Sequence, residues 1–191
     1  QEKIIFTCDP WDAPTGGKDC EKCNDLSGGI PCSEYMCKSL GQSCELLNGE
    51  GEGEDSFCAW VNQKDVSFPI ITPWENALLE GYVYTPDGAR SPPDRGFIVF
   101  KEGTKNGKGC VQAFEPLTFG ITTNEPAKCK IDYTRKQGFD DMNFWHGGNS
   151  LFAYNHTQLM ALPGPNSGNG SNPVLQNNGN YELYVRCMDA N

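Results

Sequence analysis

Ten cysteines in 191 residues are the strongest constraint on how this chain can fold. Six of them crowd into residues 20 to 58, where aliphatic residues are few: Cys20, Cys23, Cys32, Cys37, Cys44 and Cys58. A segment this short buries too little apolar surface to fold alone, so disulfides must replace a hydrophobic core there. The even total also favours disulfides over reduced thiols. We therefore expect a small disulfide-rich module over residues 9–66.

Zinc is the alternative to disulfides in this module. Cys20 and Cys23 have the spacing of zinc ligands, but a structural zinc site needs a second such pair. Cys32 and Cys37 are separated by four residues, and no histidine lies near them. We expect no metal and no cofactor.

Two local elements are predicted in the module. The run PCSEYMCKSLGQ favours one short helix: Pro31 suits the first turn, Ser33 caps the helix if it starts later, and Gly41 suits its end. Cys32 and Cys37 are five residues apart, so they should point in different directions and pair with different partners.

The run CELLNGEGEGEDSFCAWV predicts a hairpin with Cys44 and Cys58 at the bases of its arms. Its tip, Gly49 to Asp55, is rich in glycine and acid, which invites a calcium interpretation through Glu50, Glu52, Glu54 and Asp55. The aspartate spacing of a calcium-binding loop is absent, so a solvated loop is favoured and calcium binding stays open.

From residue 67 onward the chain reads as a second, β-rich domain, 67–191. Short apolar runs separated by proline, glycine and asparagine predict a sandwich of many strands. In AKCKIDY and YELYVRC, alternate residues are apolar, and each run has one inward cysteine. Cys129 and Cys187 should therefore lie on neighbouring strands and form a disulfide.

Composition and charge exclude several function classes. A net charge of −10 and a pI near 4.6 oppose a nucleic-acid partner. No apolar run is long enough to span a membrane, and no signal segment opens the chain, so its first residue should be a mature or excised end. His146 and His156 lie in no nucleophile motif, and the adjacent Asp140 and Asp141 point apart, so we expect no enzyme.

Two surface features remain. The sequons at Asn155 and Asn169 predict N-glycosylation and suit an extracellular surface. Trp74, Phe144, Trp145 and Tyr154 would form a sugar-binding platform if two or more of their rings were coplanar and exposed, although aromatic residues in an all-β chain usually belong to cores or interfaces.

A family resemblance rests on several motifs in the second half of the chain. These are TNEPAKCKI (123–131), FDDM (139–142), YNHT (154–157) and YELYVRCMDAN (181–191). Together they resemble the immunoglobulin-like or fibronectin-III-like modules of large archaeal cell-surface proteins. CSEYMCKSLGQSC (32–44) is similar to the cysteine-rich insert that accompanies those modules. The resemblance implies an all-β, immunoglobulin-like β-sandwich preceded by the disulfide-rich module, with no attached enzymatic activity.

The resemblance also implies that one strand is missing at the C-terminus. In that family a further strand, ending in cysteine and Asp-Pro, follows the strand that YELYVRC matches. Here IIFTCDP (4–10) resembles it instead. Residues 1–8 form an apolar strand with Ile4, Phe6 and Cys8 on one face, and they precede any domain that would obviously hold them.

These expectations combine into a structural subunit of an extracellular filament or cell-surface layer, in which residues 2–8 complete the sandwich of the next copy. Cys8 and Cys110 are left over once the other cysteines are paired, so they should form a bond within or between chains. The partner is another copy of the chain. The alternatives are a carbohydrate-binding adhesin module, whose partners are surface glycans, and one excised repeat of a giant surface protein.

Overall fold

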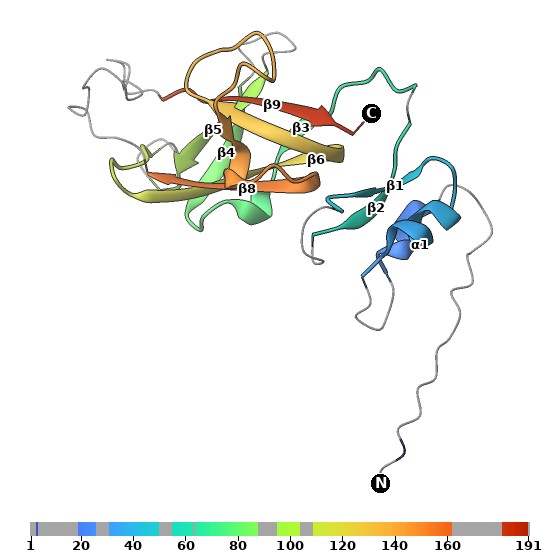
Figure 1. The fold of residues 1–191 in the computed structure, drawn as a ribbon. Helices are drawn as coiled ribbons and strands as arrows, with labels where there is room; N and C mark the ends of the chain where they lie inside the picture. The colour runs from blue at the N-terminus through green and yellow to red at the C-terminus, as the bar shows by residue number, and fades with distance from the viewer. Residues whose placement is uncertain are drawn as a thin grey trace. The chain divides into compact units, whose positions relative to one another are not determined.

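The computed structural model describes residues 3, 19–25, 31–49, 55–62, 64–87, 95–103, 109–161 and 181–190. The fold is mostly β-sheet, with one short α-helix (Figure 1). The chain divides into two compact units between Val66 and Ser67, which is the predicted boundary. We call the first unit the disulfide module and the second, Ser67–Ala190, the β unit. Ile4, Phe6 and Cys8 lie outside the described residues.

The disulfide module contains four described elements. They are the 3-10 helix η1 (Cys20–Cys23), the helix α1 (Glu34–Ser39) and the strands β1 (Cys44–Leu47) and β2 (Phe57–Trp60). The helix starts after Pro31 because Ser33 caps it: the Met36 N–H donates to the Ser33 hydroxyl at 3.3 Å. β1 and β2 pair as the predicted hairpin, with Leu46 opposite Cys58.

The β unit contains seven described strands and two short 3-10 helices. They are β3 (Ile71–Pro73), η2 (Glu75–Ala77), β4 (Tyr82–Asp87), β5 (Gly96–Lys101), β6 (Pro116–Asp132), β7 (Phe144–Trp145), η3 (His146–Gly148), β8 (Ala153–Ala161) and β9 (Tyr184–Asp189). β6 is the centre of a five-stranded antiparallel sheet, in which β3, β7, β8 and β9 all pair with it. β4 and β5 form a separate two-stranded antiparallel sheet.

β6 joins the predicted strand AKCKIDY to the preceding run PLTFGITT, so that the two form one strand. Its pairing with β8 changes register between Thr122 and Ala127. Within this irregularity the Thr123 hydroxyl bonds to the carbonyls of Glu125 and Tyr154, at 2.7 and 3.2 Å. Ile131, near the end of the strand, belongs to the same buried cluster as residues near its start, so both halves of β6 cover one core.

The two sheets pack across a shared apolar core. One buried cluster consists of Tyr82, Leu117, Phe119 and Ile131, and the other of Ile121, Ala127 and Cys129. The Tyr84 hydroxyl joins the sheets through Gly120: it accepts from the glycine N–H at 2.9 Å and donates to its carbonyl at 3.1 Å. The predicted alternation places odd-numbered residues of β6 in this core.

Two apolar runs, YELYVRC and GCVQAF, form less strand in the structure than their apolar residues suggest. In YELYVRC the strand begins at Tyr184, because its partner β6 ends at the facing residue Asp132. The Asp132 carboxylate accepts hydrogen bonds from Thr134 and Asn143, which turn the chain away from the sheet. The run GCVQAF contributes one isolated bridge, Gly109 to Lys101, and no strand among the described residues.

Candidate assembly surface

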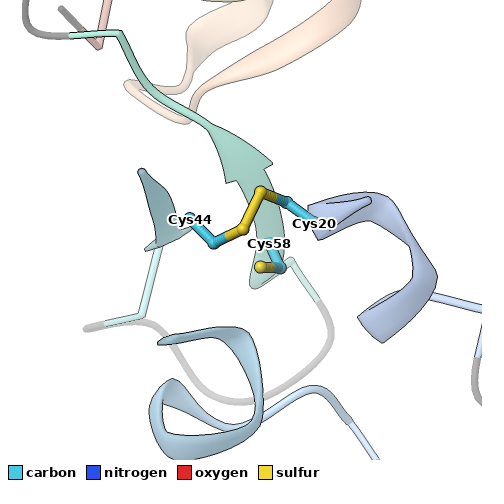
Figure 2. Close-up of side chains that lie close together, drawn as sticks. All are labelled: Cys20, Cys44 and Cys58. Atoms are coloured by element: carbon cyan, nitrogen blue, oxygen red, sulfur yellow. A yellow bond between two sulfur atoms is a disulfide. The ribbon is translucent and has the colours of Figure 1, made fainter. Parts of the chain in front are cut away.

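The six cysteines of the disulfide module form three bonds: Cys20–Cys44, Cys23–Cys32 and Cys37–Cys58. Cys32 and Cys37 have different partners, as their spacing predicts. The bonds join η1, α1 and the hairpin, and six of the seven residues in the buried cluster of the module are cysteines. Figure 2 shows the Cys58 sulfur beside the Cys20–Cys44 bond. This order of pairing was not predictable from spacing, because six cysteines allow fifteen arrangements.

Sulfur atoms in this cluster meet the distance requirement for a metal site. Those of Cys20, Cys44 and Cys58 lie within 4.8 Å of one another, as do those of Cys32, Cys37 and Cys58. A metal needs thiolates, however, and every one of these sulfurs is bonded to a second sulfur in the structure. The cluster therefore acts as a covalent core in its disulfide-bonded form.

The fourth disulfide lies in the β unit, between Cys129 on β6 and Cys187 on β9. The two residues are directly opposite in the sheet, with their Cα atoms 4.1 Å apart. Cys129 is fully buried, whereas Cys187 is only half-buried. The bond fastens β9 to the central strand.

Along β5 and β9, the described residues that pack against the core of the β unit are only partly buried. The inward residues of the central strand are buried, but Val185 and Cys187 of β9, and Leu183 just before it, are only half-buried. The facing residues of β5, Phe97 and Val99, are half-buried too. Among the described strands, β9 pairs only with β6, and β5 pairs only with β4. We call this region the open margin.

Cys110 lies at one end of the open margin. Its neighbour Gly109 exchanges both backbone hydrogen bonds with Lys101, at 2.8 and 2.9 Å. Lys101 also faces Tyr82 of β4, so Gly109 lies on the opposite edge of β5, the edge that β4 leaves free. Cys110 is exposed and forms no disulfide with any described residue. Cys8, its predicted partner, lies outside the described residues.

Sequence reasoning did not identify β5 as one side of this margin. In GFIVFK both faces of the strand are apolar, so alternation could not show which face is inward. The structure places Phe97 and Val99 inward and leaves Ile98 42% exposed.

A pair of histidines, His146 and His156, is buried in the β unit beside Phe119 of β6. The His146 ring packs edge-to-face against Phe119 and His156, and neither of its nitrogens has a hydrogen-bond partner in the described structure. Burial, assisted by His156, lowers the pKa of His146 to about 4. His156 contacts the Ala153 carbonyl through Nε2 at 3.0 Å, and burial lowers its pKa as well.

Two glycines explain how His146 enters the core. Gly147 and Gly148 both have positive φ, 75° and 78°, in which residues with a side chain are strained. A Cβ on Gly147 would also lie 2.6 Å from the Thr157 carbonyl oxygen. The Trp-His-Gly-Gly motif is therefore a tight turn against β8 that buries the histidine.

Three of the four aromatic residues considered for sugar binding pack against neighbouring groups. Trp74 covers Gly120 with its ring edge 3.0 Å from the position of a Cβ there. Trp145 packs at an angle of 62° against Phe139, and Lys130 lies over both rings. Phe144 packs at 65° against Tyr133. Each recorded ring pair among the described residues is edge-to-face.

The remaining predicted residues lie at the surface or outside the described residues. Asn155 is exposed on the outward face of β8, and Asn169 lies outside the described residues. Asp140 and Asp141 are both exposed. Of the calcium candidates only Asp55 is described, and it is exposed.

No protein-family model matches this chain, and neither a curated protein nor a solved structure matches it. The resemblance to immunoglobulin-like modules therefore stays an expectation from the sequence motifs. The helices among the described residues are too short to cross a lipid bilayer. Disulfides of this number are typical of proteins that fold in oxidising compartments.

Proposed function

We propose that this protein is a structural subunit of an extracellular filament or cell-surface layer, assembled head to tail by β-strand donation. Residues 2–8 of one copy enter the open margin of the next copy and complete an immunoglobulin-like sandwich. The open margin is the observation that carries the proposal. It offers two apolar strands whose inward residues stay half-buried, and strand edges that no described strand covers.

The donated strand has the pattern that such a margin requires. Ile4, Phe6 and Cys8 alternate with Lys3, Ile5 and Thr7, so one face offers two large apolar side chains. Burying Ile4 and Phe6 contributes ~1.5 to 3 kcal/mol each, and about six backbone hydrogen bonds contribute ~1 kcal/mol each. The total is on the order of 10 kcal/mol, against an association cost of ~4 to 15 kcal/mol.

Because the free energy gained by docking the strand is similar to the cost of association, the strand alone holds two copies together only weakly. A filament of this kind therefore needs a second contact between copies. A head-to-tail contact does not close on itself unless its rotation permits, and it therefore propagates. The four disulfides stiffen the two units between successive contacts. The mechanism is assembly, and the partner is a second copy of the chain.

Two double-serine variants of the donor strand test the proposal. Ile4→Ser/Phe6→Ser removes the inward face of the donor strand, and Ile5→Ser/Thr7→Ser changes only its outward face. Negative-stain electron microscopy and sedimentation should show filaments for the unchanged chain and the outward variant, and monomers for the inward variant. Filaments of normal length from the inward variant would show that strand donation does not hold the copies together.

A further inference from the structure

We propose that the outward face of β6 and β9 is a contact surface on which cations bind carboxylates of a second copy of the chain. The surface consists of Lys128 and Lys130 of β6 with Arg186 and Met188 of β9, and we call it the basic face. The inference adds to the proposed function the second contact that head-to-tail strand donation needs. The basic face lies wholly within the β unit and does not depend on where the donated strand docks.

The register of the sheet brings the residues of the basic face together. Lys130 lies directly opposite Arg186, and Lys128 lies opposite Met188. The alternate residues of both strands belong to the core, so these four side chains share the outward face. Figure 1 shows β9 beside β6. Opposite residues of an antiparallel pair have Cβ atoms about 5 Å apart, so the charges of Lys130 and Arg186 are close neighbours.

None of the three cations forms an ion pair with a residue that the structure describes. The Arg186 guanidinium donates from Nε and Nη2 to the Lys136 carbonyl, at 3.2 and 2.8 Å. That carbonyl holds the guanidinium in place but carries no net charge. Asp132, the acidic residue on the same face of β6, is buried, and its carboxylate accepts from Thr134 and Asn143 instead. The positive charge of the basic face is therefore not neutralised by these contacts.

The two lysines lie over aromatic rings. The Lys130 ammonium is 4.8 Å from the ring centroid of Phe139 and 4.9 Å from that of Trp145. The Lys128 ammonium is 4.4 Å from the ring centroid of Phe152. Such contacts stabilise and orient a cation without cancelling its charge. The rings therefore hold the lysines in place for a carboxylate partner.

The arrangement of Lys130 and Arg186 is unfavourable in the isolated chain. Like charges directly opposite each other destabilise a sheet. A carboxylate between the two cations replaces that repulsion with two attractions, and charge-assisted hydrogen bonds from Lys and Arg to carboxylates are among the strong ones. The basic face therefore fits an acidic partner, which offsets the repulsion when it binds.

A second copy of the chain is the acidic partner that fits the surroundings of the cations. The chain has 25 acidic residues against 15 Lys and Arg, so carboxylates predominate among its charged groups. Met188 is 44% exposed at the centre of the basic face, and Met and Arg are both enriched at protein interfaces. An acidic polysaccharide would need open ring faces for stacking, but the Phe139 and Trp145 rings pack against each other and under Lys130.

The contact should be weak by itself and sensitive to salt. A few surface charge pairs contribute little free energy, but in a filament the donated strand already holds the copies at a high effective concentration. At about 0.1 M salt the screening length is about 10 Å, so neighbouring charges attract while the net charges of the two copies are largely screened. At about 1 M salt it is about 3 Å, and the contact should be lost.

Zero-length cross-linking between isotope-labelled copies tests the basic face directly. The full-length Ile4→Ser/Phe6→Ser variant, which lacks strand donation, is mixed in unlabelled and ¹⁵N-labelled forms at about 1 mM, where a weak contact is populated. A carbodiimide joins lysine amines to carboxylates in contact, and peptide mass spectrometry identifies links between the two forms. We expect links from Lys128 or Lys130 to an acidic residue of the other copy at about 0.1 M NaCl, and their loss at about 1 M.

Charge variants in the same background provide the matched comparison. Lys130→Glu/Arg186→Glu should lower the association constant, measured by sedimentation equilibrium, by about 100-fold, because like charges then face each other across the contact. Lys22→Glu/Lys64→Glu changes the net charge equally at exposed lysines of the disulfide module, and it should associate as before. Lys130→Gln/Arg186→Gln adds no carboxylate and should weaken association by about tenfold, which keeps the test valid if the reversed chain does not fold.

The outcomes separate the basic face from strand donation. Links from these lysines that stay within one copy, or equal association of the reversed and control variants, would overturn the basic face. Unchanged association with lost binding to alginate beads would make an acidic polysaccharide the partner, and the second copy would be wrong. Filaments of the unchanged chain without these cross-links would leave strand donation standing alone. Cross-links in a chain that forms no filaments would leave only the basic face.

Discussion

The disulfide module and the β unit are stabilised in opposite ways, the first mainly by covalent bonds and the second mainly by apolar packing. In the module, six of the seven residues of the buried cluster are cysteines, and Leu40 is the exception. In the β unit, the two buried clusters contain seven residues, of which only Cys129 is a cysteine. The module replaces packing with covalent bonds because its segment is too short to bury a core.

The difference determines which changes each unit can tolerate. A covalent core fails when its bonds are broken, whereas a packed core fails when its shape or polarity is wrong. The one disulfide among the described residues of the β unit joins the buried Cys129 of the central strand to the half-buried Cys187 of β9. Here the disulfide supplements a packed core, whereas in the module the disulfides make up most of it.

The largest effect should come from removing one bond of the module. In Cys37→Ala/Cys58→Ala the helix α1 loses its link to the hairpin, at a cost of about 3 kcal/mol to a unit with little other burial. We expect the module to unfold while the β unit stays folded, which two-dimensional NMR would show as the loss of one set of resonances. Cys129→Ala/Cys187→Ala is the matched control, and its β unit should be destabilised yet remain folded. A folded module in the first variant would contradict the comparison.

Low pH should lower the free energy of unfolding of the β unit, because His146 has a lower pKa in the folded state. The pKa of His146 is 6.5 when unfolded and about 4 when folded, so the unfolded state binds more protons between these values. The free energy of unfolding should therefore fall as the pH drops from about 6.5 to 4, by about 3 kcal/mol in total. Chemical denaturation across this range measures the slope. His146→Phe should lose most of it and leave the smaller part due to His156; an unchanged slope would exclude this cause.

Adding a single methyl group should destabilise the β unit where it enters the packed core and not where it lies at the surface. In Gly120→Ala the new Cβ would lie 2.6 Å from the Ala77 Cβ and 2.9 Å from the His156 carbonyl oxygen. Such overpacking should lower the free energy of unfolding of the β unit by about 1 to 3 kcal/mol. Gly96→Ala is the control, because no atom lies within 4 Å of its Cβ position. Equal thermal stability of the two variants would mean that Gly120 is not closely packed.

Local sequence signals predicted the structure correctly where it depends on the geometry of a single helix or strand. The spacing of Cys32 and Cys37 predicted different partners, and Ser33 was a candidate cap for α1. Alternation in AKCKIDY and YELYVRC placed Cys129 opposite Cys187. These inferences needed only the period of a strand or the geometry of a helix end.

Local sequence signals did not predict the structure where it depends on contacts between residues far apart in the chain. The sequence could not show that β6 continues through Thr123, because two of the Thr123 hydroxyl contacts, to the carbonyls of Ala153 and Tyr154, form only when β8 is in place. Nor could it show that His146 is buried, since that depends on Phe119 and His156. The open margin likewise depends on contacts of β5 and β9 with both buried clusters, which no local pattern encodes.

Thermal unfolding with an added peptide tests strand donation most directly. The full-length Ile4→Ser/Phe6→Ser variant supplies an acceptor whose own strand cannot dock, and a peptide of residues 1–9 supplies the donor. A ligand that binds only the folded state stabilises it with increasing concentration. We predict that the Tm of the β unit rises with the peptide and not with a scrambled peptide of the same composition. A Tm that does not respond to the peptide would contradict the account.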